Sequence, residues 1–226
     1  MCFLQIEHLI FPSSLKSIGT YAFSSNLIKR VTISENIEFI GDGAFGDNPT
    51  LERIDVSNEN QNYSSLEGIL YTKNFSELCC LPPLNSNQTL VNCVEILRNR
   101  ALNANSYSFI IPRSVKQIES GSIFRFTVTN LYIYGNIARI DDYYSHYSKI
   151  KNLFYLGDQF VDGTFALYNV DNIFANYFYN YSTFAGKSVN IMNSKYQIMI
   201  PRSCRIDLNT HTNLFNIYPF ILISLS

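Results

Sequence analysis

The chain has 226 residues, a formal net charge of −1 and 46% hydrophobic residues, which is enough apolar material for the core of one extended domain or two small ones. Because acidic and basic residues nearly balance, the charge gives no reason to expect nucleic acid or an acidic membrane surface as a partner. The sequence holds 17 Phe and 16 Tyr but no Trp, so Phe and Tyr supply the large side chains of any core.

The first eight residues, MCFLQIEH, do not resemble a secretory signal peptide. They lack a basic start and a small-residue cleavage site, and Glu7 interrupts the apolar run. No apolar run along the chain reaches the length of a membrane-spanning helix. We therefore expect neither a leader nor a transmembrane segment in this sequence.

A repeat with a constant shift of 22 begins at Leu9. Four apolar features of residues 9–23, LIFPSSLKSIGTYAF, recur at that shift in residues 31–45, VTISENIEFIGDGAF: Phe11 as Ile33, Leu15 as Ile37, Ile18-Gly19 as Ile40-Gly41, and Ala22-Phe23 as Ala44-Phe45. One unit alone cannot bury its apolar side, but stacked units join these positions into continuous rows. The alternation around Val31 predicts a half-buried strand, the glycine suits a sharp change of direction, and Ala-Phe suits a short turn or helical bend.

Residues 54–83, IDVSNENQNYSSLEGILYTKNFSELCCLPP, depart from this unit. Two apolar runs, residues 66–71 and 78–82, flank a polar stretch and predict a β-hairpin with its turn near Lys73-Asn74-Phe75. Pro82-Pro83 ends the second strand, since proline cannot donate a ladder hydrogen bond. We expect a longer, variant unit that carries an extra hairpin within a continuous solenoid.

The simple unit returns after residue 110. Ile111, Val115 and Ile118 recur as Ile133, Ile137 and Ile140, Ser122-Ile123 replace Ala-Phe, and Leu153 and Tyr155 continue the rows of Leu131 and Ile133. Residues 200–204, IPRSC, echo residues 111–115, but residues 163–195 match weakly. We therefore predict a solenoid over residues 1–162 and a degenerate repeat, cap or frayed segment over residues 163–226. The apolar tail Leu214–Ser226 is interpreted as a buried terminal strand, with a frayed end or a membrane anchor as alternatives.

The five cysteines are Cys2, Cys79, Cys80, Cys93 and Cys204. Their odd number and the absence of a C-x-x-C pair fit a disulfide framework poorly, so we expect buried free thiols. The alternative, in an oxidising compartment, is a bridge from Cys79 or Cys80 to Cys93.

Residues 11–23 and 33–45 resemble the leucine-rich repeats of BspA-like proteins, whose units read roughly I-P-x-S-V-x-x-I-G-x-x-A-F. Asn62-Tyr63, Gly68-Ile69-Leu70-Tyr71 and Leu81-Pro82 resemble the variant unit of the same family. Over residues 9–160 the resemblance implies a mainly β repeat solenoid with short strands and turns or short helices. It also implies a place at the cell surface, adhesion to host proteins or other cells, and no catalytic residues or cofactor. The chain departs from the pattern at Ser122-Ile123 and at residues 141–144, DDYY, where Ala-Phe is lost.

Residues that could carry chemistry are scattered. His8, His146 and His211 form no ligand pair, Asp141-Asp142 and Glu35…Glu38 suit solvated loops, and no phosphate-binding or nucleophile motif is present. We therefore expect no metal site, no cofactor and no enzyme activity.

The outward positions beside the buried strand residues are the candidate binding face, because solenoids bind partners on such faces. The candidate binding residues are Arg30, Thr32, Arg53, Asp55, Tyr132 and Phe154, with Asn130 and Asn152 beside them. Tyr132 and Phe154 are one repeat apart and should stack, as should Arg30 and Arg53. Aromatic and arginine side chains favour an interaction surface. Ladders that merely stabilise the sheet are the alternative interpretation.

Two functions of different kinds fit this sequence. One is a surface or secreted adhesion module that binds a protein or a glycan, and the other is an intracellular interaction scaffold of the same fold. A fragment of a larger repeat protein is a further alternative, because Leu4, Ile6, Leu9 and the apolar tail leave both ends without polar caps and open to self-association.

Overall fold

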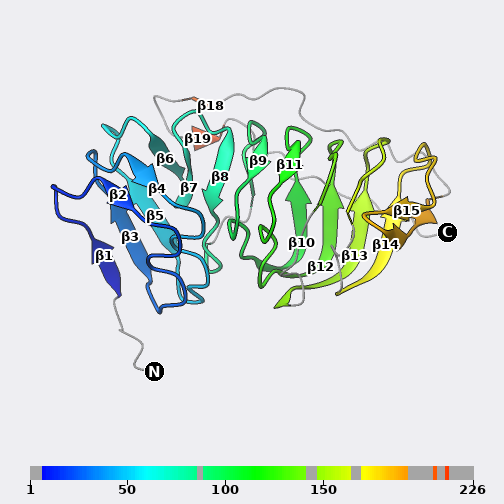
Figure 1. The fold of residues 1–226 in the computed structure, drawn as a ribbon, viewed down its shortest axis with the longest axis horizontal. Coiled ribbons are helices and arrows are strands. Elements are labelled where there is room, and N and C mark those ends of the chain that lie inside the picture. Colours follow the sequence, from blue (N-terminus) through cyan, green and yellow to red (C-terminus); the bar gives the residue numbers. More distant parts are fainter. Residues whose placement is uncertain are drawn as a thin grey trace.

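The computed structural model describes residues 7–85, 89–140, 147–163, 169–192, 206–207 and 212–213. Over residues 8–191, short strands joined by turns stack along an elongated row (Figure 1), and no α-helix is present in the described part of the chain. The strands are β1 (His8–Ile10), β2 (Ser17–Ile18), β3 (Arg30–Ile33), β4 (Phe39–Ile40), β5 (Arg53–Val56), β6 (Tyr63–Leu66), β7 (Ile69–Thr72), β8 (Glu77–Cys80), β9 (Ile96–Leu97), β10 (Asn105–Ile111), β11 (Gln117–Ile118), β12 (Thr127–Ile133), β13 (Lys149–Tyr155), β14 (Val170–Ala175), β15 (Thr183–Phe184), β16 (Lys187–Ser188), β17 (Asn190–Ile191), β18 (Ile206–Asp207) and β19 (Thr212–Asn213).

The longer strands form two parallel sheets in the predicted register. One sheet has the order β1-β3-β5 and the other β10-β12-β13-β14-β17. Leu131 pairs with Leu153, its equivalent one repeat later, and Val31 pairs with Ile54. Residues that recur at the repeat spacing in the sequence are therefore partners in neighbouring strands, which confirms the repeat solenoid.

Two further sides complete each turn of the solenoid. Short strands run along one side, in the order β2-β4 and again β8-β9-β11. Backbone hydrogen bonds between successive turns run along the other, such as those from the Phe23 amide to the Ala44 carbonyl and from the Leu102 amide to the Ser122 carbonyl. Within the described residues, the Ala-Phe positions therefore lie in turns, and the alternative of short helices is not adopted.

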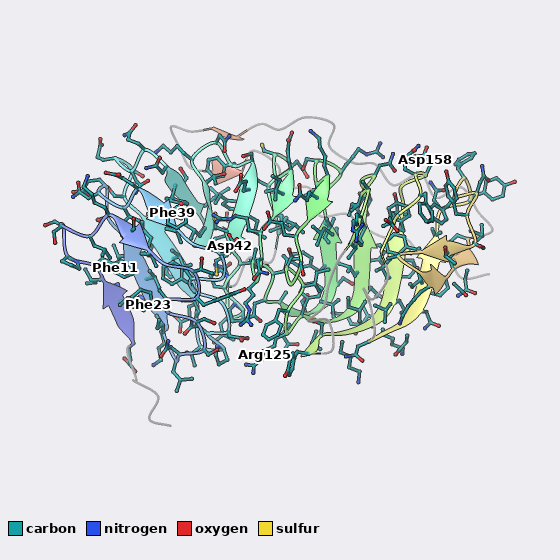
Figure 2. The ribbon with its side chains drawn as sticks, viewed as in Figure 1. Phe11, Phe23, Phe39, Asp42, Arg125 and Asp158 are labelled. Carbon is teal, nitrogen blue, oxygen red and sulfur yellow. The ribbon has the colours of Figure 1, made fainter. Side chains whose placement is uncertain are left out.

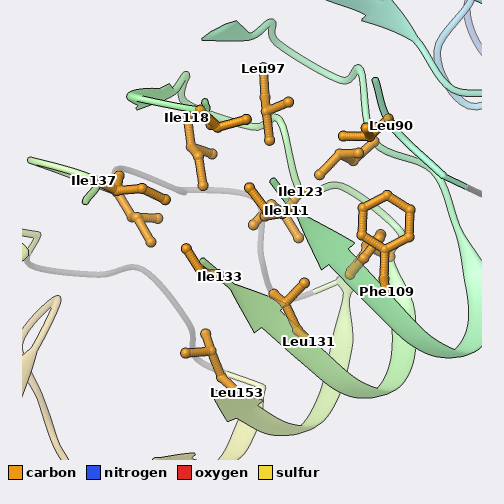
Figure 3. Close-up of a cluster of buried hydrophobic side chains, with 14 of the residues drawn as sticks. Leu90, Leu97, Phe109, Ile111, Ile118, Ile123, Leu131, Ile133, Ile137 and Leu153 are labelled. Carbon is orange, nitrogen blue, oxygen red and sulfur yellow. The ribbon is translucent and has the colours of Figure 1, made fainter. Parts of the chain in front are cut away.

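Inward-facing side chains stack in rows that form the core. Phe109, Leu131 and Leu153 come from successive strands and are buried on the same side of the sheet (Figure 3). The buried residues fall into two clusters. The first spans Phe11 to Cys80 and the second Leu66 to Ala185, and the hairpin region contributes to both.

The predicted hairpin is present but is more elaborate than expected. Strands β7 and β8 pair antiparallel around the predicted turn, which confirms that part. The single strand expected over residues 66–71 is wrong, because Glu67 and Gly68 both have positive φ and turn the chain back. Such a two-residue turn matches the twist of antiparallel strands, so β6 pairs with β7 as a second hairpin.

Two further units were not predicted from the sequence, because the spacing between their equivalent residues differs from 22. Strand β9 belongs to a unit in which Val94, Leu97 and Ala101-Leu102 are buried, and its shift to Val115, Ile118 and Ser122-Ile123 is 21 instead of 22. Strand β14 pairs with β13 at a shift of 20, as in Ile150 with Val170. The expected boundary after residue 162 is therefore not a break in the sheet.

Gly41 has a different role from the one expected of it. Its φ is not positive, so it is not needed for a sharp change of direction. A Cβ added there would lie 2.7 Å from the Thr20 Cα of the preceding turn, whereas a Cβ at Gly19 would meet nothing within 4 Å. The glycine lets two backbones approach closely.

Gly41→Ala should therefore lower the free energy of unfolding by about 2 kcal/mol, since backbone rather than a movable side chain must give way. Gly19→Ala, at the equivalent position of the preceding unit, is the matched control and should not destabilise the protein. Urea denaturation of both variants measures the difference. Equal effects would contradict the close-approach explanation.

Two cysteines agree with the expectation and one does not. Cys79 and Cys80 are buried free thiols, and burial raises the pKa of Cys79 to about 11 and that of Cys80 to about 12, which keeps both protonated and unreactive. Cys93 is disulfide-bonded, so a free thiol there was a wrong expectation. Because Cys79 and Cys80 are free, the alternative of a bridge from either to Cys93 is also wrong.

A cluster of ion pairs joins turns that are far apart in the sequence. We call Asp42, Asp47, Arg98, Arg100 and Arg125 the corner cluster. Arg98 pairs with Asp42, while Arg100 lies 2.9 Å and Arg125 lies 3.3 Å from carboxylate oxygens of Asp47. The Asp47 side chain is only 5% exposed. Asp42 lies in the middle of the molecule (Figure 2), so the cluster links the turn of residues 41–47 to the units that follow the hairpin.

Candidate functional site

The strand face divides into two parts of different chemistry. Strands β3 and β5 carry Arg30, Thr32, Arg53 and Asp55, which we call the charged half. Strands β12, β13 and β14 carry the aromatic half, defined here as Tyr132, Phe154, Phe174, Asn130, Asn152 and Asn172. Because these strands belong to separate sheets, the structure does not bring the six predicted residues together into one site.

Side chains of the charged half are paired with each other and with their neighbours. Arg30 and Arg53 are register partners, and so are Thr32 and Asp55. Arg53 forms a bidentate ion pair with Asp55, and Arg30 lies 3.4 Å from Glu52. Their guanidinium groups are thus each held by a carboxylate.

Three aromatic rings stack along the aromatic half. The centroids of Tyr132 and Phe154 are 4.8 Å apart with an interplanar angle of 11°, which confirms the predicted pair. Phe174 extends the stack, with its centroid 5.1 Å from that of Phe154 and an angle of 16°. Phe174 escaped the sequence analysis because its shift from Phe154 is 20 instead of 22. The spacing of rings equals the spacing of hydrogen-bonded strands, so the parallel sheet itself sets the stack.

The ring edges, and not the ring faces, point away from the sheet. Two rings lying flat and side by side could not bring their centroids within about 5 Å, so these rings must face one another. Both faces of Phe154, and one face each of Tyr132 and Phe174, are therefore covered by a neighbouring ring. Ring edges carry partial positive charge and attract electron-rich atoms.

A row of asparagine amides runs beside the rings. Asn152 donates to the Oδ1 of Asn130 at 3.0 Å, and Asn172 donates to the Oδ1 of Asn152 at 3.1 Å. Each of these bonds uses one N–H and one oxygen lone pair, so every amide keeps at least one further N–H and one further lone pair. The row therefore offers both donors and acceptors to a partner.

Tyr132 contributes to the stack mainly through buried packing and offers little exposed surface to a partner. It lies on the outward side as predicted but is only 5% exposed, whereas Phe154 and Phe174 are partly exposed. Burial raises the pKa of Tyr132 and raises that of the nearby Tyr134 to about 12, so neither phenol ionises near neutral pH. The rings accessible to a partner are Phe154 and Phe174.

Residues considered for catalysis or metal binding do not converge where they are described. His8 is exposed and its Nε2 lies 3.1 Å from Thr32 Oγ1, and Glu38 pairs with Lys16. His146, His211 and Asp141-Asp142 lie outside the described residues, as do the tail Leu214–Ser226 and residues 1–6. Among the residues that are described, no group of three or more His, Cys, Asp or Glu side chains is placed to hold a metal ion. The same part of the chain has no helix long and apolar enough to cross a membrane.

Three solved structures of bacterial proteins are similar to this chain, and two of them are described as leucine-rich proteins. One from Eubacterium ventriosum has 15% sequence identity and a TM-score of 0.49, and the match covers 87% of this chain and 68% of that one. The pneumococcal vaccine antigen PcpA has 16% identity and a TM-score of 0.39, covering 76% and 63%. A leucine-rich cell surface protein from Faecalibacterium prausnitzii has 14% identity and a TM-score of 0.44, covering 66% and 53%.

A family comparison is more informative. No curated protein matches the sequence at a significant level. The model of the BspA type leucine rich repeat region, in six copies, matches residues 1–76 and 70–153. These residues form most of the stacked turns described above and make up well over half of the sequence. The chain belongs to the BspA-type leucine-rich repeat family.

Proposed function

We propose that this chain is a non-catalytic binding protein whose aromatic half holds a polypeptide partner. The observation that carries the proposal is the stack of three rings beside a row of donor amides on one sheet face. Partly exposed aromatic side chains give large contact areas at small entropic cost and are enriched where binding energy concentrates. The charged half contributes less, because its arginines already have carboxylate partners and exposed pairs add little.

The orientation of the rings favours a polypeptide over a glycan. A sugar ring stacks on an open aromatic face, and the faces of Phe154 are covered by Tyr132 and Phe174. The amide row instead offers N–H groups and oxygen atoms in a regular line, which suits the backbone carbonyls and amides of an extended chain. A glycan ligand is accordingly the second outcome that the experiment below distinguishes.

The cell surface is the setting that we propose for this binding. The disulfide at Cys93 supports it, because disulfides persist in oxidising compartments and are rare in the cytosol. Surface labelling of intact cells that express the tagged protein tests the setting. Protection of the protein from a membrane-impermeant label would instead support an intracellular scaffold.

Selection from a phage-displayed random peptide library, followed by affinity measurement with a selected peptide, tests the binding face. Phe154→Ala combined with Phe174→Ala should weaken binding by about 30-fold or more, as expected for the loss of two contact residues with a combined effect of about 2 kcal/mol. Tyr132 is left intact because its burial makes substitution a test of folding.

The matched control removes two aromatic side chains elsewhere. Tyr177 and Phe178, in the turn after β14, are 51% and 53% exposed and do not belong to the stack. Tyr177→Ala with Phe178→Ala should leave peptide affinity unchanged, and circular dichroism should show both double variants folded. Equal affinities of the two double variants, or a glycan array giving the only hits, would contradict the proposed function.

A further inference from the structure

We propose that the polypeptide partner of the aromatic half is acidic. This inference rests on the proposed function, and it adds the chemistry of the partner. Two features of the surface point the same way: the lysines of β13, which form no ion pair among the described residues, and the outward ring edges.

Strand β13 carries two lysines that differ from the other basic residues of the sheets. Lys149 and Lys151 are exposed, and in the part of the chain that the structure describes neither forms an ion pair. By contrast, Lys29 pairs with Glu7, and Arg30 and Arg53 of the charged half pair with Glu52 and Asp55. The two lysines of the sheet that holds the aromatic half therefore have no carboxylate partner among the described residues. The arginines of the other sheet, in contrast, are each paired with a carboxylate.

Few other charges lie on these strands. In β10, β12, β13 and β14, the charged residues are Lys149, Lys151 and Asp171. Asp171 is exposed on β14, beside Lys151 in the register. It does not form an ion pair with that lysine in the structure, and it leaves the four strands with a net charge of +1.

The uncharged groups add to this preference. The amide row is neutral and keeps both N–H groups and oxygen lone pairs, so its N–H groups can also donate to a carboxylate. The rings of Phe154 and Phe174 present positive edges. Ammonium groups, amide N–H groups and ring edges all attract oxygen atoms that carry negative charge. Strands β12, β13 and β14 lie side by side (Figure 1), so the residues that carry these groups are on adjacent strands of one sheet.

Three synthetic probes test the inference by fluorescence anisotropy: short labelled peptides that alternate Val with Glu, with Gln or with Lys. The Glu peptide should bind most tightly, the Gln peptide more weakly and the Lys peptide least, and added salt should weaken only the binding of the Glu peptide. Lys149→Gln with Lys151→Gln should weaken binding of the Glu peptide by about tenfold, in line with the loss of two exposed charge contacts, and should leave the Gln peptide unaffected.

The matched control removes the same charge elsewhere. Lys16→Gln with Lys116→Gln eliminates two exposed lysines that lie outside the sheet of β13 and pair with Glu38 and Glu95, so affinity for the Glu peptide should not change. The acidic preference is overturned if the Glu and Lys peptides bind equally, if none of the three binds, or if a sulfated glycan outcompetes the Glu peptide. If Phe154→Ala with Phe174→Ala still abolishes binding of library-selected peptides in those cases, the proposed function stands while this inference fails.

Discussion

Replacing Asn60 with alanine should lower the free energy of unfolding by about 4 kcal/mol, at about 1 kcal/mol for each of four lost hydrogen bonds. Asn60 is fully buried, and its amide nitrogen donates to the carbonyls of Ser34 and Ile37 at 2.8 and 2.9 Å. Its Oδ1 accepts from the amides of Asn62 and Tyr63, each at 2.8 Å. Alanine removes all four bonds, and those of the Ile37 carbonyl and the Tyr63 amide are buried, whereas the Ser34 carbonyl still accepts from the Ile37 amide at 3.4 Å.

Urea denaturation of Asn60→Ala measures this loss. Asn62→Ala is the matched control, because Asn62 lies in the same loop but is exposed, and its effect should stay within about 0.5 kcal/mol. If both variants were equally stable, Asn60 would not be what fixes the hairpin unit to the preceding turn.

Replacing Asp47 of the corner cluster with alanine should cost about 3 kcal/mol, since removing one partner of a buried ion pair leaves the other charges unmatched. Arg100 depends on this carboxylate most, because its side chain is 19% exposed and its guanidinium lies over the Tyr21 and Phe124 rings, 4.8 and 4.3 Å from their centroids. Thermal and urea unfolding should both show the loss.

Glu38→Ala provides the control for Asp47→Ala. Glu38 pairs with Lys16 at the surface, with side chains 59% and 67% exposed, so the loss should remain below about 1 kcal/mol. A variant at Asp47 no less stable than the variant at Glu38 would show that the corner cluster contributes little to holding the turns together.

The parts of the fold that were predicted depend on constant spacing. The same shift of 22 relates Leu131 to Leu153 and Tyr132 to Phe154, and a parallel ladder without insertions must pair them. Strands β9 and β14 were missed because insertions and deletions in the turns change the shift to 21 and 20 without disturbing the pairing. The length of a turn can vary in this way because the hydrogen bonds between neighbouring strands fix only the pairing of the strands.

The corner cluster could not be predicted from the sequence. Arg98 and Asp42 are 56 residues apart, and their contact exists because the hairpin unit brings the turn before it close to the turns after it. The division of the strand face was missed for the same reason. A regular repeat predicts one continuous sheet, whereas β6, β7 and β8 separate the charged half from the aromatic half. Candidate binding residues could be placed on strands, but not assigned to one surface.

Strand β7 has a consequence for how the protein folds. Its consecutive residues alternate between the two apolar clusters, with Leu70 in the first and Ile69 and Tyr71 in the second. In a regular repeat protein, folding starts anywhere and spreads to the next unit through one shared core. The two strands that pair with β7 also belong to both cores, since β6 and β8 each have residues in the first and in the second cluster. Folding of the first turns and folding of the last ones therefore become one cooperative event only when β6, β7 and β8 are in place.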